Sequence, residues 1–243
     1  MKTRKTYCWL MAGICALLFA SCSSTSTGYI PQHAQVPLLE SRGDVQVTAG
    51  MSDGVLADAT LSAALTDHWA AQVHLSGQPL QNMPGTYSLG VGNYHRLGPV
   101  VFEAWAGMEQ GMVSNRAPFT YEVEWARSTT GRYVLPYVQL DAGLRDLTPL
   151  HLDVGLALRG GVMKPSFRTS QWDETGNVTY SRSYGAGTVL LEPQLLVRIG
   201  WRDVKCSLQA GWTLPWSRVV GDMDYEPFSL MIGVAFLLHG EDN

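Results

Sequence analysis

The sequence predicts an all-β protein, an up-and-down antiparallel transmembrane β-barrel of about ten strands. Three observations lead to this prediction. Apolar and polar side chains alternate with period two over most of the chain, short connections alternate with long ones, and only 16% of the residues are charged. A soluble surface usually carries about 25–35% charged residues. Beyond the N-terminal region, no stretch is apolar for the roughly 20 residues that a transmembrane helix needs.

The first 21 residues have the layout of a secretory signal peptide. Lys2, Arg4 and Lys5 form a positive start, an apolar run over 9–20 follows, and small residues lead into Cys22. The apolar run is too short to span a bilayer as a helix. The ending resembles a bacterial lipoprotein signal, which implies cleavage before Cys22 and acylation of that cysteine, for example with palmitate.

Residues 22–43 are predicted to be a linker between the lipid and the fold. The stretch Ser23–Gly28 is small and polar, as a tether requires. The runs Tyr29-Ile30-Pro31 and Val36-Pro37-Leu38, with Gly43-Asp44 directly before the first strand, resemble the start of Bacteroidetes outer-membrane lipoproteins that have β-rich bodies. The resemblance implies location and architecture but no assigned chemistry. A Pro-containing linker of an unrelated exported domain is the alternative.

Residues 44–238 are predicted to form the barrel, and residues 239–243 a C-terminal tail. The last strand shows the alternation most clearly, with large apolar residues at every second position from Phe228 to Leu238. Ten segments follow the pattern, the first four more weakly: 44–50, 55–65, 70–76, 86–95, 100–109, 138–145, 152–159, 189–199, 205–214 and 228–238.

Period two alone does not say which face points outward. In a soluble sandwich or a lipocalin-like carrier the apolar face fills the core, whereas in a membrane barrel it meets lipid and the polar face lines the lumen. The polar face here is rich in Gly, Ala, Ser and Gln, which suits a crowded interior. We therefore expect Phe228, Leu230, Ile232, Val234 and Phe236 to point outward. The residues expected to point inward are Ser207, Gln209 and Gln194.

The connections support an outer-membrane topology of periplasmic turns and extracellular loops. The short connections are 66–68, 97–99, 146–150 and 201–203. The long polar connections are 77–85, 114–132, 164–185 and 216–227, and the first connection, 51–54, is short although it belongs to this second set. This alternation predicts a periplasmic N-terminus, with the lipid of Cys22 in the nearby leaflet of the outer membrane.

The inward face carries charges that need partners, because a charge in a narrow lumen is poorly solvated. Strand heights counted from the short turns place Arg159 level with Glu192, and Asp153 level with Arg198, on neighbouring strands. We predict these two lumen charge pairs. Ten strands enclose an interior close to that of eight-stranded barrels, which side chains just fill, so a general diffusion pore is disfavoured. A narrow path for ions or small solutes is the alternative.

The sequence indicates no cofactor and no metal site, and it excludes several functional classes. Loss of the three signal-peptide cations changes the formal net charge from −4 to −7, which disfavours nucleic acid as a partner. Only Cys206 remains free after processing, so neither an internal disulfide nor a cysteine zinc site is possible. The nearest candidate catalytic group is His74 with Ser76 and Asp58 on one polar face. A lumen hydrogen-bond network is the alternative for the same residues.

The long loops carry aromatic residues suited to a binding surface, among them Tyr121, Trp125, Trp172 and Tyr180. Their packing against one another is the alternative. We therefore expect a lipid-anchored outer-membrane barrel with a structural role, or a binding role carried by its loops. The expected partners are outer-membrane lipid and an extracellular protein or glycan. An outer-membrane hydrolase (a protease or a lipid-modifying enzyme) and a soluble, lipid-tethered periplasmic lipocalin-like carrier remain as alternatives.

Overall fold

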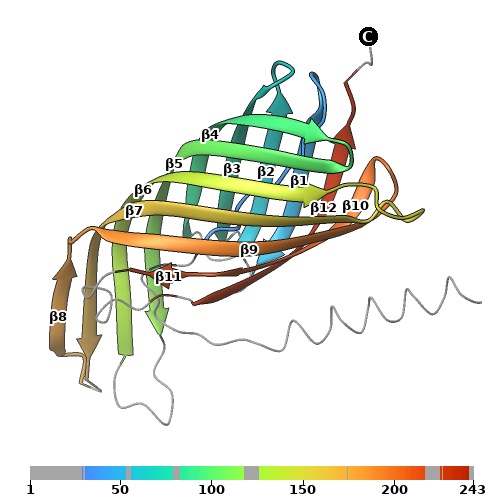
Figure 1. The fold of residues 1–243 in the computed structure, drawn as a ribbon. Helices are drawn as coiled ribbons and strands as arrows, with labels where there is room; N and C mark the ends of the chain where they lie inside the picture. Colours follow the sequence, from blue (N-terminus) through green and yellow to red (C-terminus); the bar gives the residue numbers. More distant parts are fainter. Residues whose placement is uncertain are drawn as a thin grey trace, which may run out of the picture.

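A computed structural model describes most of the barrel region. The described residues are 29, 31–52, 56–78, 83–117, 126–173, 175–216, 225 and 227–240. The predictions for the signal peptide, for Cys22 and for the tail residues 241–243 fall outside these residues. Within them the chain forms one antiparallel sheet, shown in Figure 1. Its strands are β1 (Val45–Ser52), β2 (Leu56–Ala64), β3 (Trp69–Gln78), β4 (Met83–Leu97), β5 (Val100–Ala117), β6 (Ala126–Leu144), β7 (Asp153–Trp172), β8 (Val178–Tyr184), β9 (Thr188–Gly200), β10 (Val204–Trp212), β11 (Leu214–Pro215) and β12 (Phe228–Leu238).

Ten of the described strands close into a barrel, which confirms the predicted fold class. β1 to β7 pair in chain order, β7 pairs with β9, β9 with β10, and β10 with β12. β12 returns to β1 in a continuous ladder from Val45↔Leu238 to Ser52↔Met231, so the ring has no free edge. The two further strands are short additions. β8 pairs with the end of β7, and β11 pairs with the start of β9.

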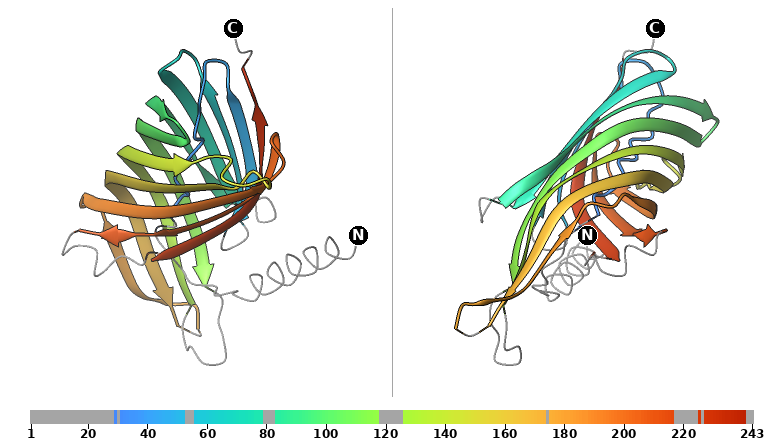
Figure 2. Two further views of the ribbon diagram at one scale, coloured as in Figure 1. Left: turned by 45° about the vertical axis from the view of Figure 1, so that its right-hand side comes forward. Right: turned by 90° about the vertical axis from the view of Figure 1, so that its left-hand side faces the viewer.

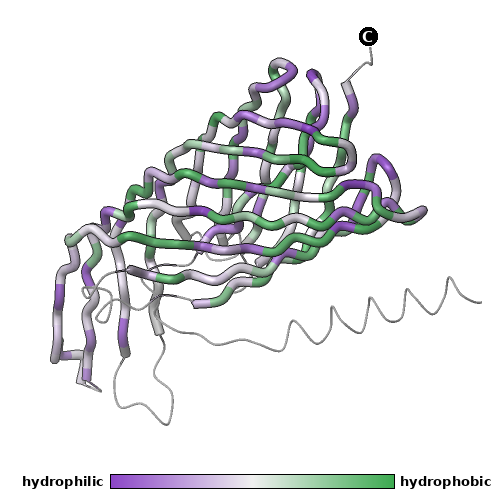
Figure 3. Tube along the Cα trace, viewed as in Figure 1, coloured by the Kyte–Doolittle hydropathy of each residue, from purple (hydrophilic) through white to green (hydrophobic). Residues whose placement is uncertain are grey.

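Large apolar side chains point out of the barrel and polar ones point in. On β12, Phe228 and Phe236 are 41% and 46% exposed, and the three aliphatic residues between them on the same face are half-buried. Ser207, Gln209 and Gln194 are buried in the lumen. The alternation of hydropathy along each strand is visible in Figure 3. This is the arrangement of a membrane-spanning barrel, and it excludes the soluble lipocalin-like carrier, whose apolar face would fill the interior.

The wall of the barrel is much taller on one side than on the other. β1 and β2 have 8 and 9 residues, whereas β5, β6 and β7 have 18, 19 and 20. The predictions of long loops over 114–132 and 164–185 were therefore wrong for much of their length, because these residues continue the strands. The outward apolar side chains form a band around the barrel, which we call the apolar belt. Beyond this belt the outward side chains are polar like the inward ones, so the alternation that marks a strand in the sequence is lost.

The two ends of the barrel differ accordingly. We call the end with the tight connections, such as Leu97-Gly98-Pro99, the short-turn end; Gly98 adopts a φ of +64° there. The opposite end, from which the β5–β6 and β7–β8 hairpins project, is the long-strand end (Figure 1). Within the described ranges, none of the segments is a helix long and apolar enough to cross a membrane.

Candidate functional site

The lumen contains a piece of the chain itself. Residues 31–39 are buried along their whole length, Glu40 is half-buried, and Tyr29 has no exposed surface. In Figure 2 this blue segment lies inside the ring of strands. We call the described residues 29 and 31–40 the lumen segment. The sequence predicted a linker between the lipid and the fold for residues 22–43, and residues 29 and 31–40 of that range lie inside the barrel instead.

Side chains of the barrel wall bind the backbone of the lumen segment. Pro31 and Pro37 lack an N–H group, and the segment joins no sheet, so its carbonyl groups need other donors. Each carbonyl from Gln32 to Leu38 accepts a hydrogen bond from a side chain. The wall donors are Arg159 and Gln194 to the carbonyl of Gln32, Gln209 to Ala34, Gln139 to Gln35, Arg198 to Val36 and Pro37, and Arg145 to Leu38. Gln35 Nε2 donates to the carbonyl of His33.

Apolar contacts and glycines complete the fit. Val36 and Leu38 belong to a buried cluster that includes Val101 and Leu196 of the wall. A Cβ atom added to Gly143 would lie 2.5 Å from Leu38 Cδ2, so the absence of a side chain on β6 makes room for this leucine. The wall and the segment are therefore complementary in shape as well as in hydrogen bonding.

A charge cluster near the middle of the lumen anchors the start of the segment. Arg159 Nε lies 2.7 Å from Glu192 Oε2, and Arg159 Nη1 lies 2.8 Å from Glu109 Oε2. The Tyr29 hydroxyl donates to Glu192 Oε1 at 2.8 Å, and the Tyr133 hydroxyl donates to Glu109 Oε1 at the same distance. The structure thus brings Arg159 and Glu192 together and adds Glu109, a second carboxylate that the sequence reasoning did not include.

A second charge cluster lies closer to the short-turn end. Asp153 and Arg198 are register partners, but Arg198 Nη1 is 4.0 Å from Asp153 Oδ2. The closer partner of Asp153 is Lys205, whose Nζ lies 2.6 Å from Asp153 Oδ1 and 3.0 Å from Asp146 Oδ1. Partial burial would raise the pKa of Asp146, but the hydrogen bond and positive charge of Lys205, with a hydrogen bond from His151, lower it.

The candidate catalytic group is only partly assembled. His74 Nε2 lies 2.9 Å from Asp58 Oδ1 on the neighbouring strand, and both side chains are buried. The Ser76 hydroxyl is engaged elsewhere, since it donates to Gln32 Oε1 at 2.6 Å. This geometry ties Ser76 to the lumen segment rather than to the histidine, as in a lumen hydrogen-bond network. The described residues contain no group of three or more His, Cys, Asp or Glu side chains placed to hold a metal ion.

Two of the four predicted loop aromatics are described, and both lie on strands that project past the barrel. Trp172 is the last residue of β7, and Tyr180 lies in the middle of β8, 39% exposed. Tyr121 and Trp125 fall outside the described residues. The guanidinium of Arg182 lies 5.2 Å from the centroid of the Tyr184 ring, a cation–π contact on β8.

The outward face of the same projecting strands is basic. Arg132 on β6 and Lys164 and Arg168 on β7 are exposed. Arg132 is the register partner of Ser166, so it sits between the two β7 cations. Tyr180 and Tyr184 of β8 lie on the other face of these strands, because their register partners Gln171 and Phe167 are on the lumen side of β7. We call the outward face of the long-strand ends of β6 and β7, with Arg132, Lys164, Arg168 and Trp172, the projecting sheet surface.

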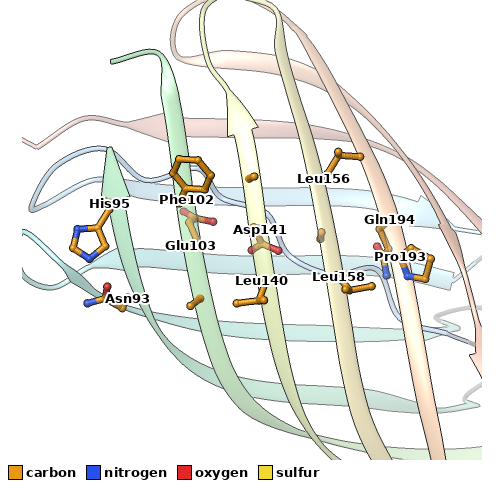
Figure 4. A pocket seen from close by; sticks show the side chains of 13 residues that line it. Asn93, His95, Phe102, Glu103, Leu140, Asp141, Leu156, Leu158, Pro193 and Gln194 are labelled. Carbon is orange, nitrogen blue, oxygen red and sulfur yellow. The ribbon is translucent and has the colours of Figure 1, made fainter. Parts of the chain in front are cut away.

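A hollow of about 550 Å³ lies on the outside of the wall, across β4 to β9 (Figure 4). Phe102, Leu140 and Leu156 line it and are exposed, while Asn93 and His95 add polar atoms at one edge. Small residues at 104 and 142 create the depression. Because the hollow opens onto the apolar outer face, its lining suits hydrocarbon chains better than polar chemistry.

Comparisons with known proteins agree in architecture only. No family model and no curated protein matches the sequence. The solved structures that match include the KdgM porin, at 12% identity over 81% of this chain and 99% of the porin, with a TM-score of 0.38. A bacterial polysaccharide outer membrane secretin matches at 12% identity over 83% and 100% of the two chains, with a TM-score of 0.26. OmpT, an outer membrane protein of Vibrio cholerae, matches at 8% identity over 81% and 96%, with a TM-score of 0.19. Matches this distant carry no argument about ligands or transport.

Proposed function

We propose that the protein is a lipid-anchored barrel of the outer membrane that binds an extracellular protein or glycan through its projecting sheet surface and does not serve as a diffusion channel. The observation that carries the proposal is the contrast between inside and outside. The lumen is occupied by the chain's own segment, while one side of the wall continues far beyond the apolar belt.

Membrane location is supported by the outer face of the barrel. An apolar band with polar residues inside is stable only where lipid surrounds it, and closed barrels of this kind are typical of bacterial outer membranes. The lipid anchor rests on the signal-peptide pattern that ends at Cys22. Anchor and barrel are independent attachments to the same membrane.

A closed lumen argues against a porin-like role. In the described part of the chain, the lumen segment uses side chains from β5, β6, β7, β9 and β10 as hydrogen-bond partners. A solute crossing the barrel would have to break these contacts and leave buried arginines without their carbonyl partners. These contacts stabilise the state in which the lumen segment fills the barrel.

The projecting sheet surface has the chemistry of a binding site. Trp172 lies on the same face of β7 as Lys164 and Arg168, and it offers flat apolar surface with a polar N–H group, which suits sugar rings and protein side chains. Arg132, Lys164 and Arg168 add positive charge, so the preferred ligand is an anionic glycan or an acidic protein segment. A rigid β-sheet holds these groups in place, which lowers the entropy lost on binding.

Binding by the purified, detergent-solubilised full chain tests the proposal. The ligands are arrayed acidic glycans and extracellular proteins of the same cells, and the variant is Arg132→Ala/Arg168→Ala/Trp172→Ala. The matched control is Trp201→Ala, which removes an exposed aromatic side chain from the short-turn end. The proposal expects at least tenfold weaker binding for the triple variant and no change for the control. Equal binding by all three proteins would reject the projecting sheet surface as the site.

A further inference from the structure

The lumen segment runs through the barrel in one direction. Its last residue, Glu40, lies at the short-turn end, where its carboxylate is 3.1 Å from Arg96 Nη1 and 3.7 Å from Arg145 Nη1, next to two short turns. Moving back along the chain, the carbonyl of Gln35 accepts a hydrogen bond from Gln139 on β6, which lies six positions before Arg145 and closer to the long-strand end. The segment therefore climbs away from the short-turn end as the residue number falls.

Tyr29 lies at the opposite end of this path. Its ring packs edge-on against Tyr133, with the two centroids 5.2 Å apart, in a buried cluster with Met163 and Phe167. Tyr29 also forms a parallel bridge with Tyr225, which belongs to the long connection between β11 and β12. The first described residue of the chain is thus at the long-strand side of the lumen.

The side chains on the outer surface show how high Tyr29 lies relative to the membrane. Along β7 the outward residues are apolar up to Val162, which is 42% exposed, and then change to Lys164 and Arg168. Met163, which belongs to the same buried cluster as Tyr29, lies between Val162 and Lys164 in the sequence and points inward. Tyr29 is therefore level with the edge of the apolar belt, where the outer leaflet gives way to water.

We infer that the chain leaves the barrel at the long-strand end, so that the acyl group of Cys22 is held in the outer leaflet of the membrane. The inference rests on the proposed lipid anchor. It reverses the expectation from the sequence, which put the N-terminus and its lipid on the periplasmic side because the first strand starts there. The first strand does start there, but the residues before it cross the membrane inside the barrel.

Chain length and solvation support the outward exit. Tyr29 lies seven positions after Cys22, a reach of about 25 Å at most, which is enough to come out of the barrel mouth and turn down into the adjacent leaflet. Return through the lumen is blocked by the segment that already fills it. A return through lipid would place the polar stretch Ser23–Gly28 in hydrocarbon with unpaired backbone groups, which costs several kcal/mol per group.

Cysteine labelling of intact cells tests the inference. Three variants of the full chain are made in a Cys206→Ala background: Ser26→Cys in the stretch between Cys22 and Tyr29, Ser181→Cys on exposed β8, and Asp67→Cys in an exposed short turn. A membrane-impermeant maleimide is added before and after permeabilisation of the outer membrane. Metabolic labelling with a fatty acid reports acylation of Cys22, and heat-modifiable gel mobility reports folding of each barrel.

The inference expects Ser26→Cys to react in intact cells to at least 80% of its level after permeabilisation, as Ser181→Cys does, while Asp67→Cys reacts only after permeabilisation. Reaction of Ser26→Cys only after permeabilisation, in a folded and acylated barrel, would overturn it. Loss of fatty-acid labelling with reaction of Ser26→Cys from outside would instead overturn the proposed lipid anchor and support the outward path of the chain.

Discussion

Arg159 and Arg198, two of the buried arginines that bind the lumen segment, differ in how their charge is balanced. Arg159 lies between two carboxylates, those of Glu109 and Glu192, at 2.8 and 2.7 Å, and donates one further hydrogen bond to the carbonyl of Gln32. Its contact with the segment is an addition to an ion-pair network that would exist without the segment.

Arg198 has the opposite balance. Its nearest carboxylate, on Asp153, is 4.0 Å away and is held by a lysine instead. The guanidinium of Arg198 donates to the carbonyls of Val36 and Pro37 and to the side chain of Gln46. Peptide dipoles of the lumen segment therefore supply the solvation that a carboxylate would otherwise give.

The difference separates barrel stability from closure of the lumen. The cluster around Arg159 belongs to the wall, so its loss should affect folding. The contacts of Arg198 belong to the segment, so their loss should loosen the filling while the wall keeps its ladder of backbone hydrogen bonds.

Replacing Arg159 should have the largest effect on stability. Arg159→Ala leaves the carboxylates of Glu109 and Glu192 buried without a cation, which should lower the free energy of unfolding by about 3–5 kcal/mol. Urea unfolding of the barrel in detergent micelles, followed by tryptophan fluorescence, measures the change. Arg159→Ala/Glu109→Gln/Glu192→Gln should recover at least half of the loss. A triple variant as unstable as the single one would show that the loss does not come from unpaired charge.

Replacing Arg198 should have a smaller effect on stability. Arg198→Met leaves the carbonyls of Val36 and Pro37 unpaired, which should cost about 1–3 kcal/mol in the same urea experiment. Asp153 keeps Lys205 as its partner, so no carboxylate is stranded. A loss equal to that of Arg159→Ala would mean that Arg198 is part of the wall's ion-pair network after all.

Filling the space beside Leu38 tests the fit of the segment without touching a charge. The new methyl group of Gly143→Ala would lie 2.5 Å from Leu38 Cδ2, so the segment or the leucine must shift, at a cost of about 1–2 kcal/mol. Gly160→Ala is the matched control on the next strand, where the nearest atom is 3.8 Å from the added Cβ. Equal thermal stability of the two variants would argue against close packing of Leu38.

The anchor of the segment at the short-turn end predicts a pH dependence. Burial would raise the pKa of Asp44, but hydrogen bonds from the backbone N–H groups of Gly240, Glu40 and Ser41 lower it below its usual value. A depressed pKa stabilises the folded state above the unfolded-state pKa of about 3.9, and the contribution is lost as the pH falls through the folded-state value.

Asp44→Asn should therefore lower the free energy of unfolding by about 1 kcal/mol between pH 6 and 8. The unfolding curves of the variant and the natural protein should start to converge below about pH 4, where the carboxyl group of the unfolded chain takes up a proton, and should meet once the pH is below the depressed folded-state pKa. If the difference in the free energy of unfolding stays constant down to pH 3, the charge of Asp44 does not stabilise the folded protein.

The fold was predictable because a membrane barrel is encoded locally. Outward residues such as Phe228 and Phe236 meet lipid at every second position, and the register that alternation implies places Arg159 opposite Glu192. Trp105, which breaks the pattern by falling on the polar face, does point inward, where Gly92 on β4 makes room for its ring. The alternation of apolar and polar side chains can be read directly from the sequence.

The filling of the lumen was not predictable in the same way. The segment from Pro31 to Leu39 has no periodicity, and two prolines make it look like a linker. Its position depends on donors such as Gln139 and Gln209, which are far away in the sequence. The inward Gln and Arg side chains of the wall were the one signal in the sequence, because their N–H donors in a narrow lumen can bind the carbonyl groups of a peptide backbone.

Conductance in planar lipid bilayers tests most directly the claim that the chain closes its own barrel. The full-length protein should insert without steady ohmic channels, and Arg198→Met/Gly143→Ala should show frequent openings because the segment is held less firmly. Gly160→Ala should stay as silent as the natural protein. Steady open channels from the natural protein, with a folded barrel by gel mobility, would contradict the account.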